Sequence, residues 1–241
     1  VKQLFIFDSL TSTNQYLTQN SALGHGTVCL TEHQTAGRGR QGRTWLSPFG
    51  CNLYLSLLWE LPKATVTGLS LAIGIAVVRA LSHYGIANVQ LKWPNDVQYQ
   101  GKKIAGILIE LLGATTTHCQ AVIGIGLNLS MPLAMAETLD QPWTDVATIS
   151  GKKPARNQLV GLTLDELLAL LPEFSQTGFA PLQAEWENYH AYAGCDVTLT
   201  LANEIQQGRV YGIDALGRLQ VNCGGTIKPF NSGEISVRLS T

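Results

Sequence analysis

The chain has 241 residues, a length that predicts one large domain with a smaller one appended. Hydrophobic residues make up 45% and charged residues 14%, against about 25% charged in an average globular domain. This composition excludes a disordered, charge-driven chain. The chain contains 16 Lys and Arg and 17 Asp and Glu, which gives a net charge of −1. Nucleic-acid binding would therefore need a local basic patch, and only Arg38, Arg40 and Arg43 form one.

The spacing of the cysteines and the length of the apolar runs indicate where in the cell the protein is located. The 5 cysteines are scattered and never spaced C-x-x-C, which argues against a disulfide framework and against a zinc site. Residues 1–7 are too short an apolar stretch for a signal peptide. The longest apolar run, residues 69–80, contains Ser70 and Arg79 and is too short for a membrane span. We therefore expect a cytoplasmic protein without membrane contact.

The first part of the chain, up to residue 193, mixes patterns of period two with patterns of period 3.6. Strands are predicted at residues 4–7, 27–31, 52–59, 89–93, 97–100, 103–111 and 118–129. Helices are predicted at residues 14–19, 68–84 (ended by Gly85), 157–171 (ended by Pro172) and 180–192. This order favours an α+β fold in which helices lie on one side of a mixed, mostly antiparallel sheet.

From residue 194 the pattern changes to short apolar runs separated by turns. Strands are expected at residues 197–201, 205–213, 219–223, 226–230 and 235–239, with turns at 203, 214–217, 224–225 and 232–233. This spacing is typical of a small all-β barrel, and so short a segment needs support from the larger domain. We therefore divide the chain into domains at residues 1–193 and 194–241.

Residues 37–45, here named the arginine loop, carry Arg38, Arg40, Arg43 and three glycines. Gly37–Gly42 matches G-x-G-x-x-G, but the strand and helix that a dinucleotide fingerprint needs are missing on either side. The glycines let backbone N–H groups approach an anion, and arginine suits carboxylate and phosphate. Ordering about eight residues costs about 8 kcal/mol or more, whereas a charge-assisted hydrogen bond returns about 1.5–3 kcal/mol. Either the loop is a lid ordered by a ligand with several oxygens, or it is a solvated flexible loop.

A second candidate segment follows the turn at Pro94, Asn95 and Asp96. Lys103 opens an otherwise apolar strand, where it could neutralise charge that develops at an acyl phosphate, although a single lysine more commonly lies on the surface. Gly106 would let a ligand lie flat on this strand.

A third segment, residues 123–129, carries Gly124, Gly126 and Asn128. Glycines within a strand indicate close approach by a ligand or by another backbone. No Ser-His-Asp or Cys-His set is evident, and no carboxylates have the spacing of a metal site. A metal is expected only as Mg²⁺ bound to a nucleotide.

Taken together, these segments resemble biotin protein ligases. The motifs that carry the resemblance are residues 12–14, 34, 37–45, 92–96, 103–108, 124–128, 228–230 and 233–236. The resemblance covers the chain from about residue 8 to its end. It implies a class II synthetase-like catalytic domain with a C-terminal SH3-like barrel. It also implies a reaction in which biotin and MgATP form biotinyl-5′-adenylate and pyrophosphate, after which a lysine of a biotin carboxyl carrier protein, the acetyl-CoA carboxylase subunit, is biotinylated.

The resemblance also implies roles for individual residues. The expected biotin site consists of Ser12, Thr13, Asn14, Gln34, Gly37, Arg38, Gly39, Arg40, Lys103 and Gly106. The expected ATP site consists of Arg38, Arg40, Arg43, Trp45, Asn95, Lys103 and Asn128. Lys103, Arg38 and Arg40 are the expected catalytic residues, with Lys103 stabilising charge in the transition state. No residue is expected to ligate a metal directly.

Two expectations concern partners. Members of the family that repress transcription carry an N-terminal helix-turn-helix domain, whereas this chain starts at the catalytic domain, so we expect no DNA binding by it. Because members of the family often pair through the central sheet, the resemblance also implies a homodimer. Two alternative functions stay open: a lipoate ligase of the same fold, and a non-enzymatic protein that binds phosphate or nucleic acid through the arginine loop.

Overall fold

A seven-stranded sheet forms the larger part of the protein. The computed structural model describes the whole chain except residues 137–138, 140, 202–203, 233–234 and 241. The strands are β1 (Gln3–Phe7), β2 (Thr27–Thr31), β3 (Asn52–Pro62), β4 (Val89–Lys92), β5 (Asp96–Tyr99), β6 (Lys102–Ala114) and β7 (His118–Asn128). Their order is β1-β2-β3-β7-β6-β5-β4, and every neighbouring pair is antiparallel except β1 and β2. The prediction of a mixed, mostly antiparallel sheet is confirmed.

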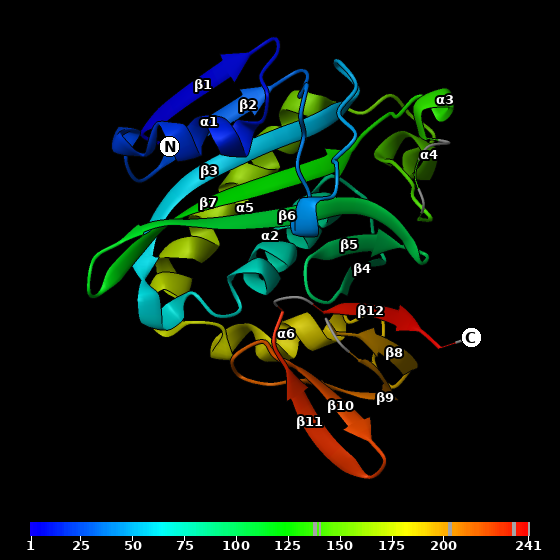
Figure 1. The fold of residues 1–241 in the computed structure, drawn as a ribbon. Coiled ribbons are helices and arrows are strands. Elements are labelled where there is room, and N and C mark those ends of the chain that lie inside the picture. The colour runs from blue at the N-terminus through cyan, green and yellow to red at the C-terminus, as the bar shows by residue number, and fades with distance from the viewer. Residues whose placement is uncertain (137–138, 140, 202–203, 233–234, 241) are drawn as a thin grey trace.

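Helices cover both faces of this sheet (Figure 1). Helices α2 (Leu69–His83) and α5 (Arg156–Thr177) pack on one face, over the main hydrophobic core. Helix α1 (Thr13–Gln19) lies on the other face, where Leu17 packs with Cys29, Leu58 and Val122. The expectation of helices on one side is therefore wrong for α1. The fourth predicted helix is represented by α6 (Gln183–Asn188) and a preceding 3-10 turn (Ala180–Leu182).

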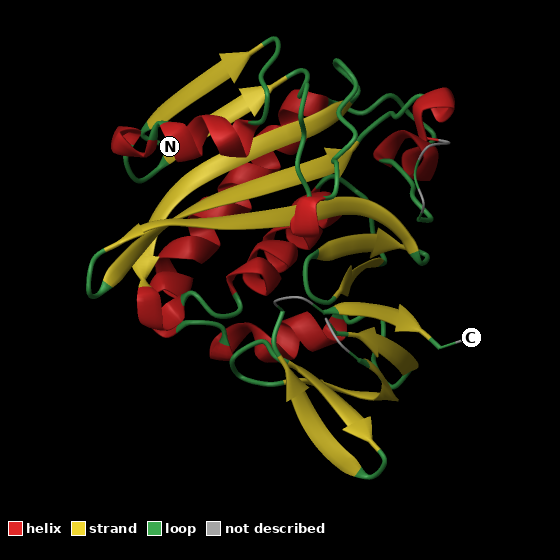
Figure 2. Ribbon diagram, viewed as in Figure 1, coloured by secondary structure: helices red, strands yellow, loops and turns green. Residues whose placement is uncertain are grey.

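A second, five-stranded sheet completes the fold below the first one in Figure 2. It contains β8 (Asp196–Thr200), β9 (Ile205–Ile213), β10 (Leu219–Cys223), β11 (Thr226–Phe230) and β12 (Ser236–Leu239), in the antiparallel order β11-β10-β9-β8-β12. These strands match the sequence prediction within a residue or so. Asn203, Gly233 and Glu234, which belong to a predicted turn and a C-terminal motif, lie outside the described residues.

The helices differ from the sequence predictions in three further respects. Helix α5 continues through Pro172 to Thr177, because Phe174, beyond the proline, is buried against the core and stabilises the continued helix. The helix predicted at 180–192 is shorter, and two short helices, α3 (Leu133–Ala136) and α4 (Val146–Ser150), were not predicted. Among the described residues, the helices are too short or too polar to cross a membrane.

Candidate active site

The register of the central strands creates one polar face and one apolar face. Odd-numbered residues of β3 and β7, and of β6 from Ala105 to Ile109, lie in the core beneath α2 and α5, for example Leu55, Ile107 and Ile125. Even-numbered residues of these stretches point to the face that carries α1. At the start of β6, next to a register shift in the β5–β6 pairing, the alternation is reversed, so that Ile104 lies in the core and Lys103 lines the cleft. Because Tyr54 pairs with Gly126 and Gly126 with Gly106, the even positions of three strands lie side by side. This face is the floor of the site.

An open cleft lies over this floor. The arginine loop, the start of α1 and strands β3, β6 and β7 line it. Eleven of the residues that the sequence analysis assigns to biotin or ATP are among its lining: Ser12, Thr13, Asn14, Gln34, Arg38, Gly39, Arg40, Trp45, Asn95, Lys103 and Gly106. The fold therefore brings together segments that are nearly one hundred residues apart in the sequence.

Glycines keep the floor flat. A Cβ atom on Gly126 would lie 2.4 Å from Cε2 of Trp45, and one on Gly106 would lie 2.9 Å from Cζ3 of the same indole. A Cβ atom on Gly124 would lie 2.2 Å from the Asn14 Oδ1 atom. Larger residues at these three positions would fill the space where side chains from the loop and from α1 meet the sheet.

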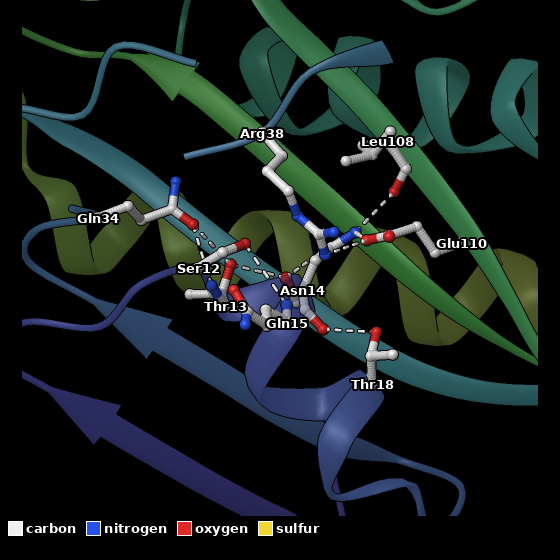
Figure 3. A network of polar contacts seen from close by, with 10 residues as sticks. Ser12, Thr13, Asn14, Gln15, Thr18, Gln34, Arg38, Leu108 and Glu110 are labelled. Carbon is white, nitrogen blue, oxygen red and sulfur yellow. Dashed lines mark hydrogen bonds and ion pairs between the residues drawn. The ribbon is translucent and has the colours of Figure 1, made fainter. Parts of the chain in front are cut away.

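A network of polar groups lines one side of the cleft (Figure 3). Ser12 caps α1, and its Oγ atom accepts a hydrogen bond from the backbone of Gln15. The backbone N–H and the hydroxyl of Thr13 donate to Oε1 of Gln34, at 3.0 and 3.3 Å, and Nε2 of Gln34 donates to Ser47 Oγ at 3.0 Å. Ordered hydroxyl and amide groups of this kind suit a polar ring held in an otherwise apolar slot.

The arginine loop folds back on itself above the floor. Gly39 N–H donates to the Arg43 carbonyl at 2.7 Å, and Trp45 N–H donates to the Gly37 carbonyl at 2.9 Å. Residues 40–42 form a 3-10 turn. Arg40 leaves this turn towards the cleft, donates to Asn95 Oδ1 at 3.1 Å and donates to the carbonyl of Ser232. Burial lowers the pKa of Arg40, with Asp96 opposing the shift, and the guanidinium stays charged at neutral pH.

Lys103 lies at the end of the cleft next to β5. Its Nζ atom is 2.6 Å from Asp96 Oδ1 and 5.4 Å from the centre of the Trp45 ring, and its side chain is 14% exposed. Lys92 lies near the same carboxylate, with Nζ above the Tyr192 ring. Burial lowers the pKa of Lys92, Asp96 raises it, and Lys103 lowers it further. The cleft thus combines several fixed cations with the carboxylate of Asp96.

Three predicted residues do not line the cleft. Gly37 is buried behind Trp45, whose carbonyl oxygen would be 2.4 Å from an added Cβ. Arg43 is exposed and donates to Oε1 of Gln41. Asn128 is buried, with Nδ2 donating to the Thr144 carbonyl at 3.1 Å, and its Oδ1 atom has no hydrogen-bond partner among the described residues.

Three residues that contact this site were given no role in the sequence analysis. Tyr54 lines the cleft, Ser56 contacts Asn14, and Glu110 pairs with Arg38. The period-two pattern of the strands was the available signal, since all three lie at even positions of β3 and β6. Asp96, which belongs to the motif at residues 92–96, pairs with Lys103. In the described part of the chain, His, Cys, Asp and Glu do not gather in the groups of three that a metal site requires.

Comparisons with known proteins identify relatives of the whole chain. Residues 6–128 match the model of the "Biotin/lipoate A/B protein ligase family", and residues 194–238 match the "Biotin protein ligase C terminal domain". The chain is 42% identical over 230 residues to the bifunctional ligase/repressor BirA of Escherichia coli, an alignment that covers 94% of this chain and 71% of that protein. It is 32% identical over 244 residues to a biotin–[acetyl-CoA-carboxylase] ligase of Mycobacterium tuberculosis, covering 97% of this chain and 88% of the relative.

A solved structure has the same architecture. The biotin protein ligase of Aquifex aeolicus, in complex with biotin and ATP, superimposes with a TM-score of 0.85 at 31% sequence identity. The alignment covers 100% of both chains, so the large sheet and the C-terminal sheet are both shared.

Proposed function

Because this chain belongs to the biotin/lipoate A/B protein ligase family, we propose that it attaches biotin to a lysine of a carboxyl carrier protein at the expense of ATP. The observation that carries the proposal is the composition of a single cleft. Lys103, Arg38 and Arg40 come from distant parts of the chain and line it together with the polar pair of Thr13 and Gln34. The cations suit carboxylate and phosphate oxygens, and the polar pair suits the ureido ring of biotin.

The first step forms a mixed anhydride. A carboxylate oxygen of biotin attacks the α-phosphorus of MgATP, the bond to the bridging oxygen of the β-phosphate breaks, and pyrophosphate leaves with the electron pair. Negative charge accumulates on the α-phosphate oxygens. Lys103, Arg38 and Arg40 stabilise that charge and hold the two anionic reactants close together, which removes most of the orientational cost of the step. The magnesium ion arrives as part of the nucleotide substrate.

The second step transfers the biotinyl group. The neutral ε-amine of the acceptor lysine attacks the acyl carbon of biotinyl-5′-adenylate, AMP leaves, and the amine loses a proton as the amide forms. The arginine loop lies over the glycine floor and, in this proposal, protects the adenylate from water until the acceptor enters. Trp45 of this loop supplies apolar area towards the nucleotide.

The test is exchange of labelled pyrophosphate into ATP, run in parallel with biotin and with lipoate. We expect exchange with biotin and none with lipoate. Exchange with lipoate alone would overturn the substrate assignment, and no exchange with either would overturn the activity. Transfer of labelled biotin to a carrier domain, with its acceptor lysine replaced by arginine as the matched control, tests the second step.

We further propose that residues 1–193 are the catalytic domain and that residues 194–241 are the C-terminal domain. Support comes from the C-terminal family match, which begins at residue 194, immediately before β8.

We also propose that two copies of the chain pair through the large sheet, supported by the exposed apolar side chains Leu4, Ile6 and Leu111 on its strands. The free cysteines and the need for ATP support a cytoplasmic location. Light scattering at rising protein concentration tests the pairing.

A further inference from the structure

Glu110 connects the two halves of the cleft without lining it. The residue lies on β6, at an even position opposite Val122, and its side chain is 27% exposed. A single oxygen, Oε2, accepts a hydrogen bond from Asn14 Nδ2 at 2.8 Å and forms an ion pair with Arg38 Nη2 at 3.0 Å (Figure 3). One carboxylate therefore contacts both the first turn of α1 and the arginine loop.

Asn14 is held at both ends of its amide. Nδ2 donates to Glu110 and, at 3.4 Å, to the Leu108 carbonyl, while Oδ1 accepts from the Ser56 hydroxyl at 2.6 Å. Asn14 is 3% exposed. Since both ends of the buried amide are occupied, Asn14 forms a fixed wall of the cleft, and the acceptor provided by Glu110 determines which way that amide faces.

Arg38 is the first arginine of the arginine loop and is 42% exposed. The same guanidinium lines the cleft, where the carboxylate and phosphate oxygens of the substrates are expected. An entering anion and Glu110 therefore compete for one cation. When the anion takes Arg38, Glu110 still holds Asn14, so the wall of the cleft stays in place while the loop is free to follow the ligand.

We propose that Glu110 is a positioning residue that orients Asn14 and holds the arginine loop against the sheet through Arg38 before the substrates bind. The inference rests on the proposed function only for the identity of the ligand. It predicts that loss of the Glu110 charge releases the loop in the ligand-free protein. A released loop must then be ordered by the ligand itself, so the KM for biotin rises while kcat changes little.

Tryptic cleavage of the ligand-free protein measures the release directly, because trypsin cuts after arginine within the loop. In Glu110→Gln, cleavage after Arg40 and Arg43 is expected to be about three- to fivefold faster than in the unmodified protein, consistent with the modest strength of partly exposed ion pairs. Glu60→Gln is the matched control, because it removes one negative charge from an exposed position of β3. Equal cleavage rates in Glu110→Gln and the unmodified protein would overturn the proposal.

A second variant tests whether faster cleavage comes from loss of the ion pair or from a general loss of stability. Arg38→Gln removes the other partner at a half-exposed position, and cleavage after Arg40 and Arg43 should accelerate by a similar factor. In the double variant with Glu110→Gln, the acceleration should be no greater than in either single variant, since one ion pair is lost in all three. Additive accelerations would show that the two residues act independently, which contradicts the proposal.

Two kinetic readouts separate positioning from plain structural support. Glu110→Gln keeps an oxygen for Asn14, whereas Glu110→Ala removes the acceptor for both Asn14 and Arg38, so the KM for biotin should rise further in the alanine variant. A fall in kcat with an unchanged KM in both variants would contradict the proposal.

Ligand protection separates the role of Glu110 from the identity of the ligand. Biotin with ATP should restore protection of the loop against trypsin in Glu110→Gln. If these substrates protect neither protein while the cleavage difference persists, the ligand assignment fails and the role of Glu110 stands.

Discussion

The Nζ atom of Lys103 is held in position by an ion pair with Asp96, whose Oδ1 atom lies 2.6 Å away. Lys103→Ala removes this positive charge from the cleft, and we expect biotin-dependent pyrophosphate exchange to fall by about 10²–10³-fold, the usual loss for one preorganised electrostatic contact. Lys102→Ala is the control, since Lys102 is the exposed neighbour on the same strand. A reduction of similar size in both variants would remove Lys103 from its proposed role.

Arg40 joins the arginine loop to two other parts of the molecule, through Asn95 at the β4–β5 turn and the carbonyl of Ser232. Arg40→Gly removes both contacts, so the loop should cover the adenylate less well. Rapid-quench measurements should detect biotinyl-5′-adenylate in solution, together with biotin on lysines of unrelated proteins. Adenylate retained as tightly as in the unmodified protein would contradict this assignment.

Among the elements, β7 shows most directly how a strand can shape a site. Gly124→Ala places a methyl group where Asn14 Oδ1 already lies, and Asn14 is held by Ser56 and Glu110. We expect a loss of about 1–3 kcal/mol in the free energy of unfolding, as in other overpacked sites, and weaker biotin binding. Gly113→Ala on β6 is the control, because an added Cβ meets no atom within 4 Å there. Urea denaturation with equal midpoints for both variants would show that the contact at Gly124 relaxes freely.

Elements with a strong periodic pattern were predicted well from the sequence, and elements determined by tertiary contacts were not. The apolar runs of β3 and β7 and the all-round apolar α2 carry their own signal, since burial on both sides leaves few polar positions. The predicted end of α5 was wrong. The burial of Phe174 against the core outweighs the tendency of Pro172 to end a helix, so the helix continues to Thr177. Motifs located most of the cleft. The period-two pattern places Glu110 and Ser56 on the polar face of their strands, but their partners could not be predicted, because these are distant in sequence and depend on strand register.

At the scale of the whole molecule, the C-terminal sheet is closely packed against the larger part of the protein. Trp93 is 2% exposed, and its Nε1 atom donates to the Gly217 carbonyl at 3.0 Å, across the boundary between the proposed domains. A Cβ on Gly217 would lie 2.7 Å from Leu71 Cδ1, so the two parts are closely packed at this point. Because a segment of this size has only a small core of its own, we expect the C-terminal sheet to need this contact for its stability.

Trp93→Phe removes the donor and leaves the Gly217 carbonyl without its partner, at a cost of about 1–3 kcal/mol. This loss falls on the contact between the two sheets, so hydrogen exchange should accelerate in β9 and β10 while β3 and β7 stay protected. Trp59→Phe is the control, because its indole donates to Ser175 Oγ within the proposed catalytic domain, and it should leave exchange in β9 and β10 unchanged. Equal acceleration in both sheets would contradict this expectation, because it would show that the molecule unfolds as one cooperative unit. In that case the contact between Arg40 of the arginine loop and Ser232 would be lost only on global unfolding.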